Sequence, residues 1–221
     1  REGGPITFHM GEMDSTGRIT GWEPPGRFAY EEDWAGLVGQ EGAPVTPLVT
    51  EFLVEAKSGG TCVVRVVSSA FGTGDTWEQE FFDQMEKAWT PFFQHLQLYM
   101  AHFPGQTATT LAAEVDVKGS SDAVCAAMRE NLGLYDNVPD AASIRVRGLV
   151  GQVERTDGPQ VLLRLEDPIP GYVAFFAFDK GDGIAAAVLA GYLFSDAAPA
   201  YVQREQTGWK DWLQNLSAPT A

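Results

Sequence analysis

Apolar side chains follow helical spacing through residues 75–103, the longest strongly periodic stretch of the chain. They recur every three or four positions, which places them on one face of a helix. These residues are Trp77, Phe81, Met85, Trp89, Phe92, Leu96, Met100 and Phe103. Asp75 or Thr76 can cap the first turn, and Pro104 ends the pattern. The stretch therefore predicts a long amphipathic helix, and we expect Pro91 to bend it.

The second part of this helix pattern recurs near the C-terminus. Residues 89–96 read W-x-x-F-F-Q-x-L, and residues 209–216 read W-x-x-W-L-Q-x-L. Such a recurrence indicates two copies of one module, each closed by a C-terminal helix. The first copy is richer in aromatic residues. We therefore expect a ligand site in the first module and a more completely filled second module.

Short stretches ahead of the long helix alternate apolar and polar residues, as half-buried strands do. Turn sequences such as E-P-P-G at 23–26 and K-S-G-G at 57–60 separate them, so neighbouring strands should be antiparallel. An antiparallel sheet with one apolar face needs a cover, and the long helix can supply it. The expected strands are 18–22, 27–31, 48–56 and 61–70, after a short strand within 1–10 and with a loop over 33–47.

The second half of the chain predicts an opening strand and helix that the first half lacks. Ser120 or Ser121 can cap that helix, and Gly133 can end it. The expected elements are a strand at 111–117, a helix to 133, strands at 143–153, 160–165, 172–177 and 184–193, and a helix at 200–216. By analogy, we expect the opening strand and helix of the first module to precede Arg1.

These patterns predict an α+β fold of two tandem modules. The first covers residues 1–105 and is incomplete at its N-terminus, and the second, diverged module covers residues 106–221. In each, an antiparallel β-sheet should wrap on a long C-terminal α-helix.

Charge narrows the possible partners. The chain has 15 Lys+Arg against 30 Asp+Glu, a formal net charge of −15. Nucleic acids and anionic membranes both need a basic surface, so we expect neither as a partner. No apolar run approaches membrane-spanning length, so membrane insertion is not expected. The two cysteines, Cys62 and Cys125, lack metal-site spacing, and we expect both to be buried thiols in a reducing cytoplasm.

Several sequence features together resemble the SRPBCC superfamily, whose START-like fold is called the helix grip. Within it, the first module is similar to bacterial relatives of the activator of the heat-shock protein ninety ATPase. The features are R-E-G-G at 1–4, G-W-E-P-P-G-R-F at 21–28, G-G-T at 59–61, S-S-A-F at 68–71 and the helix over 77–99. The resemblance implies an apolar ligand cavity between the sheet and the long helix.

The residues expected to line that cavity are mostly apolar, with the Tyr30 hydroxyl and the Trp89 indole N–H as polar groups. Such a lining suits a hydrophobic or aromatic small molecule. The set is Phe28, Tyr30, Phe52, Val64, Val66, Phe81, Met85, Trp89 and Phe92.

Catalytic chemistry is not evident in the sequence. His95 and His102 lie seven positions apart on nearly one helix face, but no third residue has the spacing of a metal ligand. No nucleophile elbow or phosphate-binding loop occurs. We therefore expect no catalytic residues, no metal and no cofactor.

Three functions follow, in order of preference. The first is non-enzymatic binding of a hydrophobic or aromatic small molecule in the cavity. The second is a protein-interaction module that associates with a chaperone, as the ATPase-activator resemblance implies. The third is an enzyme similar to polyketide cyclases and aromatases, which needs a titratable group in the cavity. The sequence favours a non-enzymatic role over the enzyme and leaves the oligomeric state open.

Overall fold

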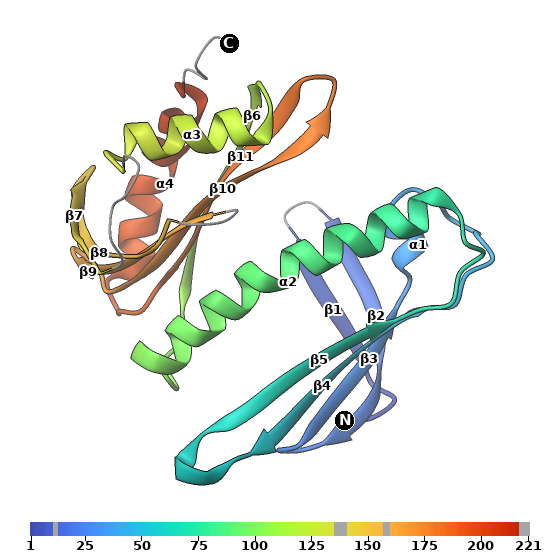
Figure 1. Ribbon diagram of the computed structural model, residues 1–221. Coiled ribbons are helices and arrows are strands. Elements are labelled where there is room, and N and C mark those ends of the chain that lie inside the picture. Colours follow the sequence, from blue (N-terminus) through green and yellow to red (C-terminus); the bar gives the residue numbers. More distant parts are fainter. Residues whose placement is uncertain (11–12, 135–140, 157–159, 217–221) are drawn as a thin grey trace. The chain divides into compact units, whose positions relative to one another are not determined.

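The computed structural model of the chain describes residues 1–10, 13–134, 141–156 and 160–216 (Figure 1). Contacts divide the chain into two compact units, unit 1 (Arg1–Met85) and unit 2 (Glu86–Ala221). The division falls inside the long helix α2 (Thr76–His102), which contains Pro91. The module boundary at residue 105 stays a prediction.

Unit 1 contains an antiparallel sheet in which each strand pairs with the next along the chain (Figure 1). The strands are β1 (Pro5–Met10), β2 (Met13–Glu23), β3 (Arg27–Glu32), β4 (Leu48–Ala56) and β5 (Cys62–Ser69). The short helix α1 (Trp34–Leu37) follows β3, and the 3-10 turn η1 (Ser58–Gly60) joins β4 to β5. The short turns between β2 and β3 and between β4 and β5 favour this antiparallel pairing, as the sequence predicted, whereas a longer segment that contains α1 joins β3 to β4.

The core of unit 1 is built around Trp34 of α1, which is fully buried. The rings of Trp77, Phe81 and Phe82 from the first turns of α2 lie 4.9, 4.8 and 5.4 Å from it, measured between ring centroids. The indole N–H of Trp34 donates a hydrogen bond to the Thr46 carbonyl at 2.8 Å. The sequence pattern predicted a loop over 33–47, so this short helix was not expected.

Unit 2 has the order strand, helix, strands, helix that the sequence predicted for the second module. Its opening strand pairs with its last strand, giving the sheet order β6-β11-β10-β9-β8-β7. The elements are β6 (Thr109–Lys118), α3 (Ser121–Asn131), β7 (Ser143–Val146), β8 (Leu149–Arg155), β9 (Gln160–Asp167), β10 (Gly171–Gly181), β11 (Ile184–Leu193) and α4 (Ala198–Gln214). The α+β class and the resemblance to the helix grip are confirmed at the level of the fold.

The sheet of unit 2 is covered on both faces. Its inner face packs against α3 and α4 through residues such as Leu163, Phe175 and Trp209. The outer face carries a second apolar cluster, which includes Leu98 and Phe103 from α2 and the region just after it. Residues 86–102 of α2 therefore belong to unit 2.

Two local predictions are corrected. Residues 143–153 form a hairpin, β7 and β8, because Arg147 and Gly148 take φ values of 50° and 80° and reverse the chain. Cys62 is exposed at the start of β5, whereas Cys125 is half-buried in α3, so the expectation of two buried thiols is wrong for Cys62.

Among the described residues, no helix is long and apolar enough to cross a membrane.

Candidate functional site on the outer face of the second sheet

Five of the predicted cavity residues share one face of the unit 1 sheet. Phe28 lies opposite Phe52, and Phe52 lies opposite Val66. The ring of Phe28 is 6.1 Å from Phe52 and 5.7 Å from Tyr30, and Val64 follows at the same side of β5. The strand register therefore gathers an aromatic surface.

The four helix residues of the predicted cavity set are divided between the two units. Phe81 contacts Trp34 in unit 1, and Met85 is the last residue of that unit. Trp89 and Phe92 lie in unit 2, where their rings contact each other at 5.3 Å. A hollow of about 510 Å³ in unit 1 is lined by other residues, including Arg18, Glu31 and Thr46. The predicted cavity between sheet and helix stays a prediction.

A chain of polar side chains runs across the outer face of the unit 2 sheet. Gln160, at the start of β9, is only 1% exposed, and its amide nitrogen donates to the Gln94 oxygen at 2.7 Å. Its amide oxygen lies 3.1 Å from Nε2 of His95. An amide oxygen can only accept, so Nε2 of His95 carries the proton and Nδ1 is the basic nitrogen. The sheet therefore fixes the tautomer of His95.

Aromatic rings surround this imidazole. Tyr172 and Tyr192 lie 5.5 and 5.9 Å from the His95 ring. Burial raises the pKa of Tyr172 to about 12, with smaller contributions from Tyr192 and Tyr99, so its hydroxyl stays protonated at neutral pH. Burial also lowers the pKa of His95, because a charged imidazole is disfavoured away from water, and the hydrogen bond to Gln160 offsets only part of this.

The lowered pKa of His95 makes stability depend on pH. The unfolded chain binds the proton more readily than the folded chain, so the stability from neutral His95 is complete above the ordinary value of 6.5. It is lost as the pH falls from 6.5 through the lower folded-state pKa. We expect His95→Gln to lose less stability over this range than the wild type, as measured by urea unfolding. The same pH dependence in both proteins would contradict this assignment.

A hollow of about 260 Å³ opens beside this polar chain, on the outer face. One side comes from α2 and the other from β8 and β9. The lining residues are Gln94, Gln97, Leu98, Ala101, His102, Glu154, Arg155 and Leu162. The volume lies just below the range of pockets for drug-sized ligands, so the hollow suits one ring or one segment of a longer molecule.

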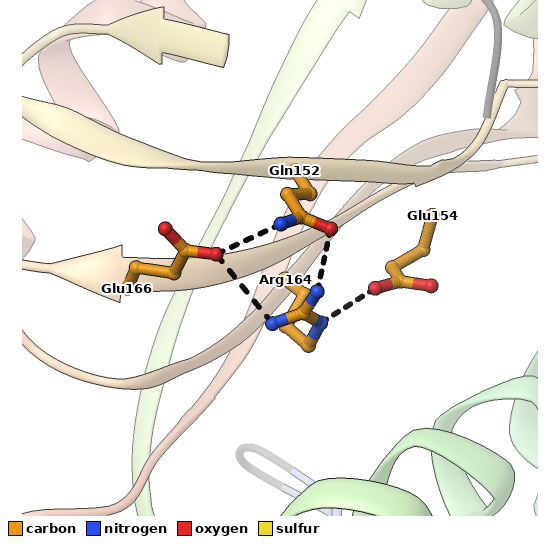
Figure 2. A network of polar contacts seen from close by, with 4 residues as sticks. All are labelled: Gln152, Glu154, Arg164 and Glu166. Atoms are coloured by element: carbon orange, nitrogen blue, oxygen red, sulfur yellow. Dashed lines mark hydrogen bonds and ion pairs between the residues drawn. The ribbon is translucent and has the colours of Figure 1, made fainter. Parts of the chain in front are cut away.

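Glu154 is held in place by a network centred on Arg164, which Figure 2 shows between its partners. Nε of Arg164 donates to Glu154 at 2.7 Å, and Nη2 donates to the Gln152 oxygen at 2.6 Å. The Gln152 amide nitrogen donates to Glu166 at 3.0 Å, and Glu166 also lies 3.7 Å from Nη1 of Arg164. The guanidinium thus fixes a carboxylate at the edge of the hollow.

The hollow combines groups with different chemical abilities. The imidazole of His102 and the carboxylate of Glu154 can transfer protons. The amides of Gln94 and Gln97 and the guanidinium of Arg155 can donate hydrogen bonds to carbonyl oxygens. Among the residues that the structure describes, no three His, Cys, Asp or Glu side chains lie together as metal ligands would.

Sequence reasoning missed most of this site. His95 and His102 drew attention as a pair, but Gln160 was predicted only as a strand residue, and Glu154 fell just beyond the strand predicted at 143–153. The available signal was a glutamine opening the apolar run Val161–Leu163, since a polar residue in such a run must face a partner.

No protein-family model and no curated protein matches this sequence. Solved structures do resemble it. The di-domain ARO/CYC protein BexL from the BE-7585A biosynthetic pathway is 12% identical, over 98% of this chain and 84% of that chain, with a TM-score of 0.37. DynU16, a putative protein in the dynemicin biosynthetic locus, is 11% identical over 99% of this chain and 83% of that chain, with a TM-score of 0.34. CalU16 from Micromonospora echinospora is 12% identical over 51% of this chain and 78% of that chain, with a TM-score of 0.39.

The preferred function from the sequence, non-enzymatic binding, is thereby corrected. The solved structures that resemble this chain include two whose titles name a di-domain ARO/CYC protein. Association with a chaperone stays a prediction, as does location in the cytoplasm.

Proposed function

We propose that this chain is an enzyme similar to polyketide aromatases and cyclases, acting at the outer-face hollow of unit 2. The observation that carries the proposal is the hollow itself, where His102 and Glu154 lie among amide donors beside an aromatic cluster. Apolar surroundings with a few polar groups suit a carbon chain that carries several ketones. The titles of the similar structures agree with this class of reaction.

The reaction that fits these groups is an intramolecular aldol condensation. The imidazole of His102 takes a proton from a methylene group between two carbonyls, leaving an enolate. The enolate carbon forms a bond with a second carbonyl carbon of the same chain, and the resulting alkoxide takes the proton back. Loss of water, as one hydroxyl group and one ring proton, gives a ring double bond, and the remaining ring ketones enolise to hydroxyl groups to complete the aromatic ring.

The other residues bind and orient the substrate in this scheme. Gln94, Gln97 and Arg155 donate hydrogen bonds to the carbonyl oxygens, which stabilises the enolate as charge develops. The hydrogen bonds among His95, Gln160 and Gln94 hold the Gln94 amide in position. Glu154, fixed by Arg164, can accept the proton that leaves with the water.

The proposal is tested with a linear poly-β-ketone thioester analogue and the full chain. We expect the wild type to accelerate formation of the aromatic product, followed by absorbance and mass spectrometry. His102→Ala should lower kcat by about a hundredfold, the lower part of the range for general acid–base catalysis.

The matched control is Met100→Ala, because Met100 is an exposed residue of the same helix that does not line the hollow. It should keep the wild-type rate. No acceleration by the wild type, or equal rates for His102→Ala and the wild type, would overturn the proposed function.

A further inference from the structure

A β-bulge brings two consecutive residues of β8 to the same hollow. Val153 pairs with Leu163 of β9. Arg155 pairs with the adjoining residue, Leu162, so Glu154 has no partner in the ladder. Successive side chains of a regular strand point to opposite faces, yet Glu154 and Arg155 both line the outer-face hollow. The extra residue thus re-aims the strand, as bulges commonly do beside active sites, and gives the β8 wall both a carboxylate and a guanidinium.

The carboxylate of Glu154 is anchored at one oxygen only. Oε1 accepts the hydrogen bond from Nε of Arg164 at 2.7 Å. Within the described part of the chain, no donor binds the second oxygen, Oε2, and Figure 2 draws it without a contact. The other carboxylate beside this guanidinium, Glu166, has a side chain that is 50% exposed and does not line the hollow. Glu154 therefore combines a fixed position with an oxygen that can take a proton.

The proposed reaction needs two proton transfers at one carbon. An attacking methylene carbon inside the substrate chain keeps neither of its hydrogens in the aromatic product. His102, on the α2 wall of the hollow, takes the first hydrogen as a proton in the proposed ring closure. The second leaves only after the new carbon–carbon bond has formed. The two walls offer one base for each transfer, His102 from α2 and Glu154 from β8.

We propose that the two steps are divided between the walls, with Glu154 as the base for loss of water and Arg164 as the residue that positions it. This assignment rests on the proposed function. Oε2 of Glu154 takes the remaining hydrogen of the attacking carbon as a proton, and the electron pair left behind forms the ring double bond as the hydroxyl group leaves. Glu154 passes the same proton to that hydroxyl group, so one water forms and the carboxylate is restored. Arg155 donates to the neighbouring carbonyl oxygen while charge develops there.

Glu154→Gln separates the two steps, because glutamine can still accept the hydrogen bond from Arg164 but cannot take a proton. With the full chain and the linear poly-β-ketone thioester analogue, the variant should consume the substrate at the wild-type rate. The aromatic product should form about a hundredfold more slowly. Chromatography with mass spectrometry, on samples quenched early, should show a ring-closed isomer of the substrate, heavier than the aromatic product by one water.

Arg164 is tested by the same product analysis. Arg164→Gln should accumulate the same isomer, and Arg164→Lys should recover part of the loss, because lysine keeps a positive donor but cannot bind Glu154 and Gln152 together. Glu114→Gln is the matched control, because it removes an exposed carboxylate from β6, the edge strand farthest from the hollow in the sheet order. It should keep both rates. Equal losses in the two Arg164 variants would overturn the positioning role.

The two proposals fail in different ways. If the wild type does not consume the substrate, the proposed function itself is wrong. If the wild type forms the aromatic product and Glu154→Gln forms it equally fast, the division between the walls is overturned and the proposed function stands. Equal slowing of substrate consumption and of aromatic product formation in Glu154→Gln would also overturn the division, because Glu154 would then not act in the second step alone.

Discussion

Replacing Trp34 with alanine should destabilise unit 1 by about 3–5 kcal/mol, the range for removing a large aromatic side chain from a core. Trp34 is fully buried, and three aromatic rings of α2 pack around its indole. Its N–H also binds the Thr46 carbonyl, which anchors the segment between α1 and β4. Alanine would remove both the packing and this anchor, so the loss should fall at the upper part of the range.

The measurement is amide hydrogen exchange on the full chain, which reports each unit separately. Exchange should accelerate throughout β1–β5 and leave the inner core of unit 2 unchanged. Trp22→Ala is the matched control, because Trp22 belongs to the same sheet but is 49% exposed. It should cost less than about 1 kcal/mol, as exposed substitutions generally do. Equal acceleration in the two variants would show that Trp34 does not organise unit 1.

Replacing Phe103 with alanine should lower the free energy of unfolding of unit 2 by about 3–5 kcal/mol, the range for removing a buried phenylalanine side chain. The buried ring of Phe103 stacks on Phe194 at 4.2 Å and lies 6.2 Å from Tyr172. This contact ties the end of α2 to the outer face of the sheet. Its loss should free residues 86–102, and the hollow should lose the wall that His102 and Gln94 supply.

Two readouts separate this effect from general unfolding. Exchange of the α2 amides should accelerate, while the inner core around α3 and α4 keeps its protection. Phe92→Ala is the matched control, because Phe92 lies on the same helix and is 51% exposed. Unchanged exchange in α2 of the Phe103→Ala protein would show that other contacts hold the helix on the sheet.

Local structure followed closely from sequence patterns. The long helix was expected at 75–103 and occupies Thr76–His102, and the strand at 184–193 has the expected bounds. The hairpin of β7 and β8 was missed for a physical reason. Its turn places Arg147 at positive φ, and arginine carries no turn signature of the kind that asparagine before glycine would.

The candidate site was harder to predict, because periodicity identifies the apolar face of a helix but not the surface that it covers. Phe103 continues the stripe that begins at Trp77, yet it packs on the second sheet beside Leu98, which lies outside that stripe. Gln160 and His95 meet only through this packing, across a separation of 65 residues. No local pattern encodes such a contact, so the site required the tertiary structure.

The double covering of the unit 2 sheet also constrains how this protein can evolve. Both faces of strand β10 are covered by apolar clusters, so residues 171–175 are all buried and none can change freely to a polar type. Strand β5 alternates exposed and partly buried positions, so every second residue can change at little cost. The two modules should therefore diverge at unequal rates, with the second retaining its strand sequences longer than the first.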